Sequence, residues 1–215
     1  MSAIELLSWA RGPALQFSIA IFIIGILVRV LEIWLLGRKK DLSEPKAAGF
    51  SAGMRTIFSR SLPPPGMLKH LISGYIFHIG FFVVLFFFVP HILLFKDVLG
   101  FGWFGLPNGL IDGITILSLA SLLYALSIRL SDPVRRMLSN FNDYFAWTVT
   151  FLPLLTGYLA FHRHFADYTL MLAIHILTVN LLLISFPFTK LTHAVTLFAS
   201  RWYNGAIAGR KGVKV

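Results

Sequence analysis

The sequence predicts an all-α integral membrane protein, a bundle of five transmembrane helices, on three observations. The 215 residues are 57% hydrophobic and only 13% charged, whereas soluble domains carry about 25% charged residues. Five apolar runs reach the roughly 20 residues that a spanning helix needs. The basic residues fall in the polar segments between these runs, a distribution that is typical of membrane topology and argues against nucleic-acid binding.

The five helices follow one another within a single predicted domain, residues 1–215. They are predicted over residues 14–36, 67–94, 110–130, 143–161 and 168–188, the last with a cytoplasmic extension. Arg29 and Glu32 interrupt the first run, and prolines at 63–65 mark the entry to the second because proline is excluded from helix interiors. The third run stops at Asp132-Pro133. Each helix is therefore bounded by a polar or proline-containing segment.

Lysine and arginine are distributed unequally between the two ends of these helices. One side carries fifteen of them and the other only three, Arg11, Lys96 and Arg163. The positive-inside rule then places the N-terminus outside and the C-terminus in the cytoplasm. The odd number of spans agrees with this orientation. We therefore expect a multi-pass protein of a prokaryotic cytoplasmic (inner) membrane, surrounded by the lipid bilayer.

Cysteine is absent from the chain, which limits the chemistry available to it. Disulfides, covalently attached c-type haem and cysteine-ligated iron–sulfur clusters are excluded. Any metal centre must be held by other side chains, and any iron–sulfur relay must belong to a partner subunit. The N-terminal residues also lack the pattern of a cleavable signal peptide, so insertion is expected to depend on the helices themselves.

Histidines are the candidate metal ligands. His175 and His193 lie 18 residues apart in the predicted fifth helix and its extension, which on one continuous helix puts them on one face, roughly 27 Å apart. The predicted second helix offers His70, His78 and His91. Two histidines on each of two helices can hold two stacked b haems, each iron bound by an imidazole from either helix. His162 and His164, at the outer end of the fourth helix, are predicted to be interfacial.

Three segments of the chain carry a family resemblance: Phe77-His78-Ile79-Gly80, residues 129–136 (RLSDPVRR) and residues 186–193 (FPFTKLTH). They resemble the gamma (cytochrome b) subunit of respiratory nitrate reductase. The resemblance extends to the group that includes membrane cytochromes of heterodisulfide-reductase-like and sulfite-reduction-associated complexes. The resemblance implies two b haems, quinol oxidation near the outer face, and electron delivery to an iron–sulfur subunit on the cytoplasmic side.

The resemblance also implies individual haem ligands. His78 and His193 correspond to the ligands of the inner haem, and His175 to a ligand of the outer haem. The fourth ligand is where this sequence departs from the family, whose pattern places it at Phe88. His91 takes that role in our preferred arrangement.

The preferred fourth ligand depends on a bend in the second helix. His91 follows Pro90, which lacks an N–H and is expected to kink the helix end and redirect His91 toward the haem. In a second arrangement His70 pairs with His193 and His78 pairs with His175. Both arrangements remain open at this stage, as does a protein with one haem.

Charged residues near the helix ends suggest two further contacts. Arg129, Arg135 and Lys190, at the inner boundary, are candidate partners for haem propionates. On the outer side, Lys96 and Asp97 with His91 are candidate hydrogen-bonding and proton-accepting groups for a quinol. The substrate expected there is menaquinone or ubiquinone.

The function predicted from these features is that of a b-haem subunit of a respiratory oxidoreductase, which carries electrons between the membrane quinone pool and an iron–sulfur partner subunit. Such a subunit belongs to the respiratory electron-transport chain and is not catalytic alone. The alternative is a haem-free membrane anchor or assembly subunit, in which the same helices tether a peripheral enzyme. Haem content separates the two.

Overall fold

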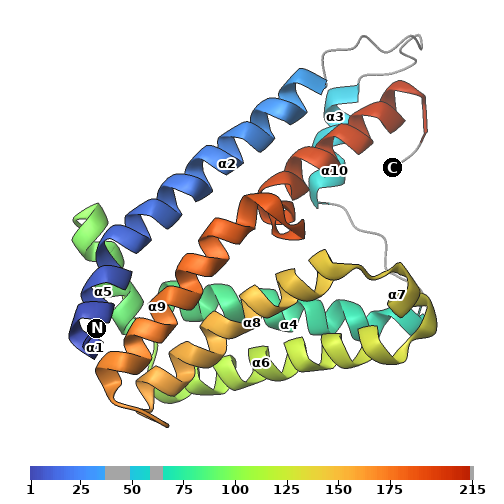
Figure 1. Ribbon diagram of the computed structural model, residues 1–215. Coiled ribbons are helices and arrows are strands. Elements are labelled where there is room, and N and C mark those ends of the chain that lie inside the picture. Colours follow the sequence, from blue (N-terminus) through green and yellow to red (C-terminus); the bar gives the residue numbers. More distant parts are fainter. Residues whose placement is uncertain (37–48, 59–64, 214–215) are drawn as a thin grey trace. The chain divides into compact units, whose positions relative to one another are not determined.

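The computed structural model describes residues 1–36, 49–58 and 65–213, and within these ranges all regular structure is helical (Figure 1). Five helices are long and apolar enough to cross a membrane, which confirms the predicted multi-pass helical fold. They cover Ala3–Leu36, Leu68–Phe87, Asn108–Ser131, Phe141–Phe161 and Tyr168–Phe188. The chain packs as two compact units, Met1–Phe17 with Pro63–Leu182, and Ser18–Leu62 with Leu183–Val215.

The first span starts earlier than the sequence predicted, at Ala3 instead of residue 14. It consists of α1 (Ala3–Trp9), a π-helical turn (Ala10–Ala14) and α2 (Leu15–Leu36). A capping box begins it, because the Ser2 hydroxyl accepts the Glu5 N–H at 3.3 Å and the Glu5 carboxylate accepts the Ser2 N–H at 2.8 Å. Pro13 lies inside the π-helical turn, where a wider backbone path accommodates its missing N–H.

Helices α4 (Pro65–Phe87), α6 (Asn108–Ser131) and α8 (Phe141–Phe161) form the core of the first unit. Figure 1 shows them running side by side. Gly80 of α4 sits directly against the Ser118 hydroxyl of α6, and the Trp147 indole N–H of α8 donates to Leu122 O of α6 at 2.9 Å. Small residues and single polar bonds at helix contacts are typical of packing within lipid.

The predicted second helix, 67–94, is interrupted at Phe88. Helix α4 ends at Phe87, Phe88 is extended (φ −78°, ψ 125°), and α5 (Val89–Leu99) begins with Pro90 in its first turn. Pro90 has no N–H for Phe86 O and its ring would collide with that carbonyl in a continuous helix. The expected kink at Pro90 is therefore a complete break, and it starts a new helix.

The carbonyls released by this break find other donors. The Trp103 indole N–H donates to Phe86 O at 2.6 Å, and Leu106 N–H donates to Phe87 O at 3.0 Å. Both donors belong to the segment that connects α5 to α6. A break inside an apolar helix is tolerated because the surrounding protein satisfies its backbone groups.

The predicted fifth helix is interrupted as well. Helix α9 covers Tyr168–Ser185, two 3₁₀ turns follow at Phe186–Phe188 and Lys190–Thr192, and α10 covers His193–Arg210. Pro187 removes one helical hydrogen bond, and Thr189 is extended (φ −120°, ψ 175°). His175 and His193 are therefore not on one continuous helix, so that premise of the prediction was wrong, and the shared face and the roughly 27 Å spacing no longer follow from it.

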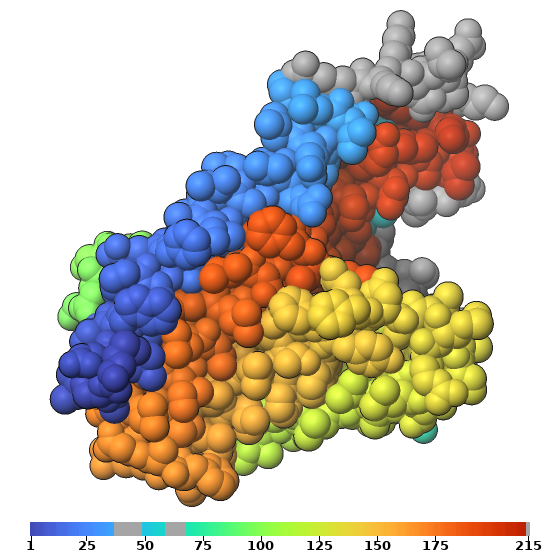
Figure 2. Space-filling view, viewed as in Figure 1, coloured from blue at the N-terminus to red at the C-terminus, as the bar shows by residue number. Residues whose placement is uncertain are grey.

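Helices α2 and α10 belong to the second unit with α3 (Gly49–Phe58). Pro187 packs directly against Gly25 of α2, and the Arg29 Nε–H donates to Pro187 O at 3.0 Å. Arg29 also forms an ion pair with Glu32 at 2.9 Å. Figure 2 shows α2 lying at the surface along its length, and its Ile24 and Leu27 side chains are each 62% exposed, as a lipid-facing helix requires.

Short helix α7 (Pro133–Leu138) follows α6 at the basic end of the first unit. The Asp132 carboxylate caps it by accepting the N–H groups of Val134 and Arg135, and these bonds lower the pKa of Asp132. The orientation of the termini stays a prediction. Six of the fifteen basic residues that support it lie outside the described residues: Arg38, Lys39, Lys40, Lys46, Arg60 and Lys214.

Candidate functional site

The break at Phe88 turns His91 into the interior of the first unit. The half-buried His91 ring lies in the first turn of α5, and its Nδ1 is 3.0 Å from Val84 O of α4. A carbonyl can only accept, so Nδ1 carries the hydrogen and the lone pair lies on Nε2. The α4–α5 junction thereby fixes both the position and the tautomer of His91.

His175 of α9 faces the same place from the other side. Its Nδ1 is 3.3 Å from the Thr156 hydroxyl of α8, and that hydroxyl donates its own hydrogen to Leu152 O at 2.7 Å. Thr156 is therefore the acceptor for His175, which places the His175 lone pair on Nε2 as well.

A glycine of α8 gives the His175 ring its room. A Cβ at Gly157 would lie 3.0 Å from Cε1 and 3.2 Å from Nδ1 of His175, tighter than normal side-chain contacts. The His175 imidazole thus packs directly against the α8 backbone at Gly157. This close approach is local to the first unit and orients the ring toward α5.

The His91 and His175 rings are brought together in a near-parallel, stacked arrangement. Their centroids are 6.3 Å apart and their planes differ by 18°. Metal–imidazole bonds are about 2 Å long, so two imidazoles on opposite sides of one metal have ring centres about 6 Å apart. Among the described residues no group of three or more His, Asp or Glu side chains could hold a metal ion, whereas a haem iron needs only two axial ligands.

The predicted inner pair belongs to different units, and its rings are held locally. His78 Nδ1 is 2.6 Å from Gly74 O, four residues back in α4, and His193 Nδ1 is 2.7 Å from Lys190 O. Both rings are exposed. Each again donates Nδ1–H to a carbonyl, so all four predicted ligands present the lone pair on Nε2, as metal-binding histidines commonly do. The pairing of His78 with His193 stays a prediction.

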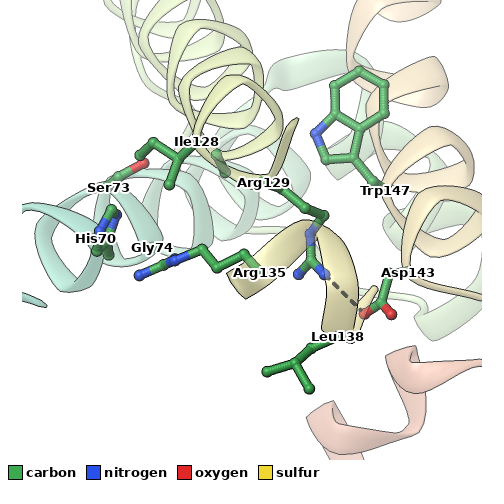
Figure 3. A pocket seen from close by; sticks show the side chains of 10 residues that line it. His70, Ser73, Gly74, Ile128, Arg129, Arg135, Leu138, Asp143 and Trp147 are labelled. Carbon is green, nitrogen blue, oxygen red and sulfur yellow. Dashed lines mark ion pairs between the residues drawn. The ribbon is translucent and has the colours of Figure 1, made fainter. Parts of the chain in front are cut away.

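His70, the alternative ligand, lines a pocket of about 330 Å³ between α4, α6, α7 and α8 (Figure 3). Arg129 and Arg135 line the same pocket. Arg129 pairs with Asp143 at 3.2 Å and Arg135 with Asp132 at 3.2 Å. Two of the three predicted propionate contacts are therefore gathered in the first unit, already ion-paired.

The third predicted propionate contact, Lys190, belongs to the second unit and is exposed. Its role stays a prediction. Within the first unit, the His91 and His175 rings are in contact, with centroids 6.3 Å apart. This contact agrees with the preferred arrangement, and the choice between the two arrangements stays a prediction.

The predicted quinone residues are not gathered. Lys96 and Asp97 are exposed on α5, and in the described part of the chain neither has a polar contact with His91. Five residues of α-helix turn through about 140°, so Lys96 projects from another face than His91. The side chain of Lys96 packs beside Gly102 instead.

A different pair of titratable side chains, His162 and Asp112, is in contact within the first unit. His162 Nε2 is 3.1 Å from Asp112 Oδ1, and both side chains are partly exposed. From the sequence alone, His162 was predicted to be interfacial. The signal that it missed is Asp112, one of the few carboxylates in an apolar run, located near the start of α6 while His162 ends α8.

Aromatic rings connect this pair to His91. Phe88 meets His91 edge to face at 5.2 Å between centroids and Phe161 at 5.1 Å. Phe161 in turn contacts His162 at 5.3 Å. The imidazole pair and the His162–Asp112 pair are therefore separated by two phenylalanine rings, which keep the space between them apolar.

Comparison with known proteins identifies a relative but not a function. The chain is 32% identical over 208 residues to a protein of Nitratidesulfovibrio vulgaris whose name, "Protein", carries no functional information; the match covers 90% of this chain and 89% of that protein. The chain belongs to the same family as that protein. No family model and no solved structure matches the chain.

Proposed function

We propose that this family member is a b-haem membrane subunit of a respiratory oxidoreductase, carrying electrons between menaquinone or ubiquinone and an iron–sulfur partner subunit on the cytoplasmic side. One observation carries the proposal. His91 and His175 face each other with a ring separation of 6.3 Å, and the acceptor at each Nδ1 leaves the Nε2 lone pair for a metal. Histidine pairs of this kind are the usual axial ligands of b-type haem.

In this proposal His91 and His175 hold one haem, and His78 and His193 hold the second. A bound haem supplies a one-electron carrier within an otherwise insulating bilayer. The chain contributes rigid ligands, since Val84 O and Thr156 fix the two rings from separate elements. Hydrogen bonds of this type keep a ligand oriented and make it more basic.

Quinol oxidation requires groups that accept protons beside the electron acceptor. The His162–Asp112 pair supports that role better than Lys96 and Asp97, because its imidazole and carboxylate are in contact at 3.1 Å. A quinol that becomes a quinone gives up two protons and two electrons. In the proposed reaction His162 and Asp112 would accept the two protons, and a haem held by His91 and His175 would supply the one-electron acceptor.

Electron delivery to a partner subunit is proposed from the opposite, basic end. The chain has no cysteine, so it cannot hold an iron–sulfur cluster with thiolate ligands. Arg129 and Arg135 lie at that end of the first unit, and fifteen basic residues in all are assigned to the same side. A surface of this charge favours an acidic partner.

Haem content tests the proposal directly. The chain, purified with its native lipids from a host supplied with haem, should give the sharp reduced-minus-oxidised bands of low-spin bis-imidazole haem, with two haems per chain by extraction. One haem would confine the proposal to His91 and His175. Absence of haem from a correctly inserted chain would refute it and leave the membrane-anchor function.

A further inference from the structure

Helices α3 and α10 pack so closely at their glycines that a side chain at those positions would collide with the neighbouring helix. A Cβ on Gly49 would lie 2.6 Å from Ala206 O, and one on Gly53 would lie 2.8 Å from Trp202 O. On the α10 side, Gly205 packs directly against the Thr56 hydroxyl. Backbones that approach this closely form a rigid pair.

An arginine of α10 fixes the end of α3. The Arg201 guanidinium donates to Thr56 O through Nε at 3.0 Å and through Nη2 at 2.7 Å. Thr56 is in the last turn of α3, where carbonyls lack helical partners and a cation is favourable. The orientation of α3 about its own axis is thus determined by α10.

The packing leaves an apolar stripe of α3 uncovered. Phe50, Met54 and Phe58 are 68%, 42% and 81% exposed. Positions four residues apart lie on one helix face, and this stripe is turned by about 120° from the face that contains Gly49 and Gly53. Ser51 and Arg55 border it and form one shallow surface with it. The helix is strongly amphipathic.

The location of α3 in the chain restricts what can cover the stripe. Twelve residues join it to α2 and six join it to α4, and the end of one span and the start of the next lie on the same side of a membrane. Between residues 37 and 64 the sequence has six Lys/Arg and two acidic residues. Within the described residues Arg55 has no acidic partner.

We propose that α3 is an interfacial helix that inserts Phe50, Met54 and Phe58 into the boundary between lipid headgroups and acyl chains, with Arg55 bound to lipid phosphate. An exposed aromatic and aliphatic stripe bordered by a cation is the pattern of helices that lie in the membrane plane. Anionic lipid complements the basic segment around it. The α3–α10 pair is then fixed to the membrane surface independently of any haem.

The absence of cysteine makes the proposal testable in the full-length chain. Single substitutions Met54→Cys and Phe58→Cys are labelled with a nitroxide in vesicles of phosphatidylcholine and phosphatidylglycerol, and collisions with dissolved oxygen and with an aqueous nickel chelate are measured. Leu117→Cys in α6 serves as a label in a spanning helix, and Lys211→Cys beyond α10 as a water-exposed one.

Labels at residues 54 and 58 should collide more with oxygen than with the chelate, at a depth between those of the two reference labels and about 5–10 Å below the headgroup surface. Preferential collision with the chelate overturns the proposal, because the stripe then faces water. Protection from both relaxants also overturns it, because the stripe is then covered by protein, whether another part of this chain, a second copy or a partner.

The role of Arg55 is tested separately in the same labelled chain. Arg55→Gln should move the residue 58 label toward water in vesicles that contain phosphatidylglycerol, whereas Arg136→Gln, which removes the charge of an exposed arginine on α7 of the first unit, should not. Equal label depth in both variants would remove lipid phosphate from the proposal. Because neither measurement depends on haem, failure here is distinguishable from failure of the proposed function.

Discussion

The two histidine pairs assigned to haem differ in what fixes their rings. His91 and His175 are half-buried, and their Nδ1 atoms are held by Val84 O across a helix break and by Thr156 of a neighbouring helix. His78 and His193 are exposed and are held by carbonyls three or four residues away in the chain. The first pair is therefore preorganised by tertiary packing within one unit, whereas the hydrogen bonds described for the second pair are local to the chain.

This difference indicates that the two proposed haem sites depend on different parts of the protein. A site preorganised by packing is sensitive to substitutions in helices that carry no ligand, such as α8. A site whose rings are hydrogen-bonded within their own segments is expected to respond less to such changes than to loss of the ligands. The predictions below use this contrast.

The orientation of the chain assigns each pair to a side of the membrane, and the expected effect is all or none. A reporter fused after Val215 should be located in the cytoplasm, and a reporter fused before Met1 should be located outside. The basis is the unequal distribution of Lys and Arg. A C-terminus accessible from the outer side would exchange the sides of the two pairs and of the proposed quinone chemistry.

Removal of a ligand of the packed pair should abolish one haem. His91→Ala leaves His175 without its counterpart at 6.3 Å, so haem stoichiometry should fall from two to one and quinol oxidation should be lost. His70→Ala is the matched control, because His70 lies in the pocket beside Arg129 and Arg135, and it should keep both haems. The reverse result would move the ligand assignments on α4 and α5 by one histidine, to His70 and His78.

The locally held pair should behave independently. His193→Ala should remove the other haem and leave the spectrum of the first unchanged, since His193 belongs to a different unit from His91 and His175. Spectra of His193→Ala and His91→Ala should therefore add up to that of the unmodified chain. Loss of both haems in His193→Ala would show that the sites are coupled.

Gly157 tests preorganisation without touching a ligand. Gly157→Val places side-chain atoms on the His175 ring, where even a Cβ would be 3.0 Å from Cε1, and should displace the ring and lower the content of one haem severalfold. Gly113→Ala, where nothing lies within 4 Å of the new Cβ, is the control. Unchanged haem content in Gly157→Val would mean that the His175 ring has another orientation when haem is bound.

Thr156→Val should give the smallest effect. It removes the acceptor at 3.3 Å from His175 Nδ1 while keeping the shape of the side chain. Loss of such a second contact typically lowers metal affinity by about 10- to 100-fold, measured here as haem retention during dilution, with a shift in the midpoint potential of one haem. Thr150→Val, which loses only the hydrogen bond from its own hydroxyl to Ala146 O, should leave haem retention and the midpoint potential unchanged.

Much of the fold could be predicted because the apolar composition of a run is enough to identify a membrane-spanning helix. A spanning helix must satisfy its backbone internally and expose apolar side chains, so runs such as 110–130 and 143–161 identify α6 and α8 to within two residues. The breaks were harder. Pro90 and Pro187 were visible, but a proline can kink a helix or end it, and the outcome depends on whether groups such as the Trp103 indole are present to take the freed carbonyl.

The sequence by itself determined that this is a five-span helical membrane protein without thiolate chemistry, with histidines as its candidate ligands. Only the tertiary structure decided which histidines meet. Two 3₁₀ turns interrupt the chain between His175 and His193. The ring centroids of His91 and His175 lie 6.3 Å apart, and His162 is paired with Asp112, 50 residues away in the sequence. The physical reason is that membrane spans follow from the summed hydropathy of about 20 residues, which the sequence contains. The direction of the His91 ring depends on a single carbonyl, Val84 O, and that of the His175 ring on the absence of a Cβ at Gly157.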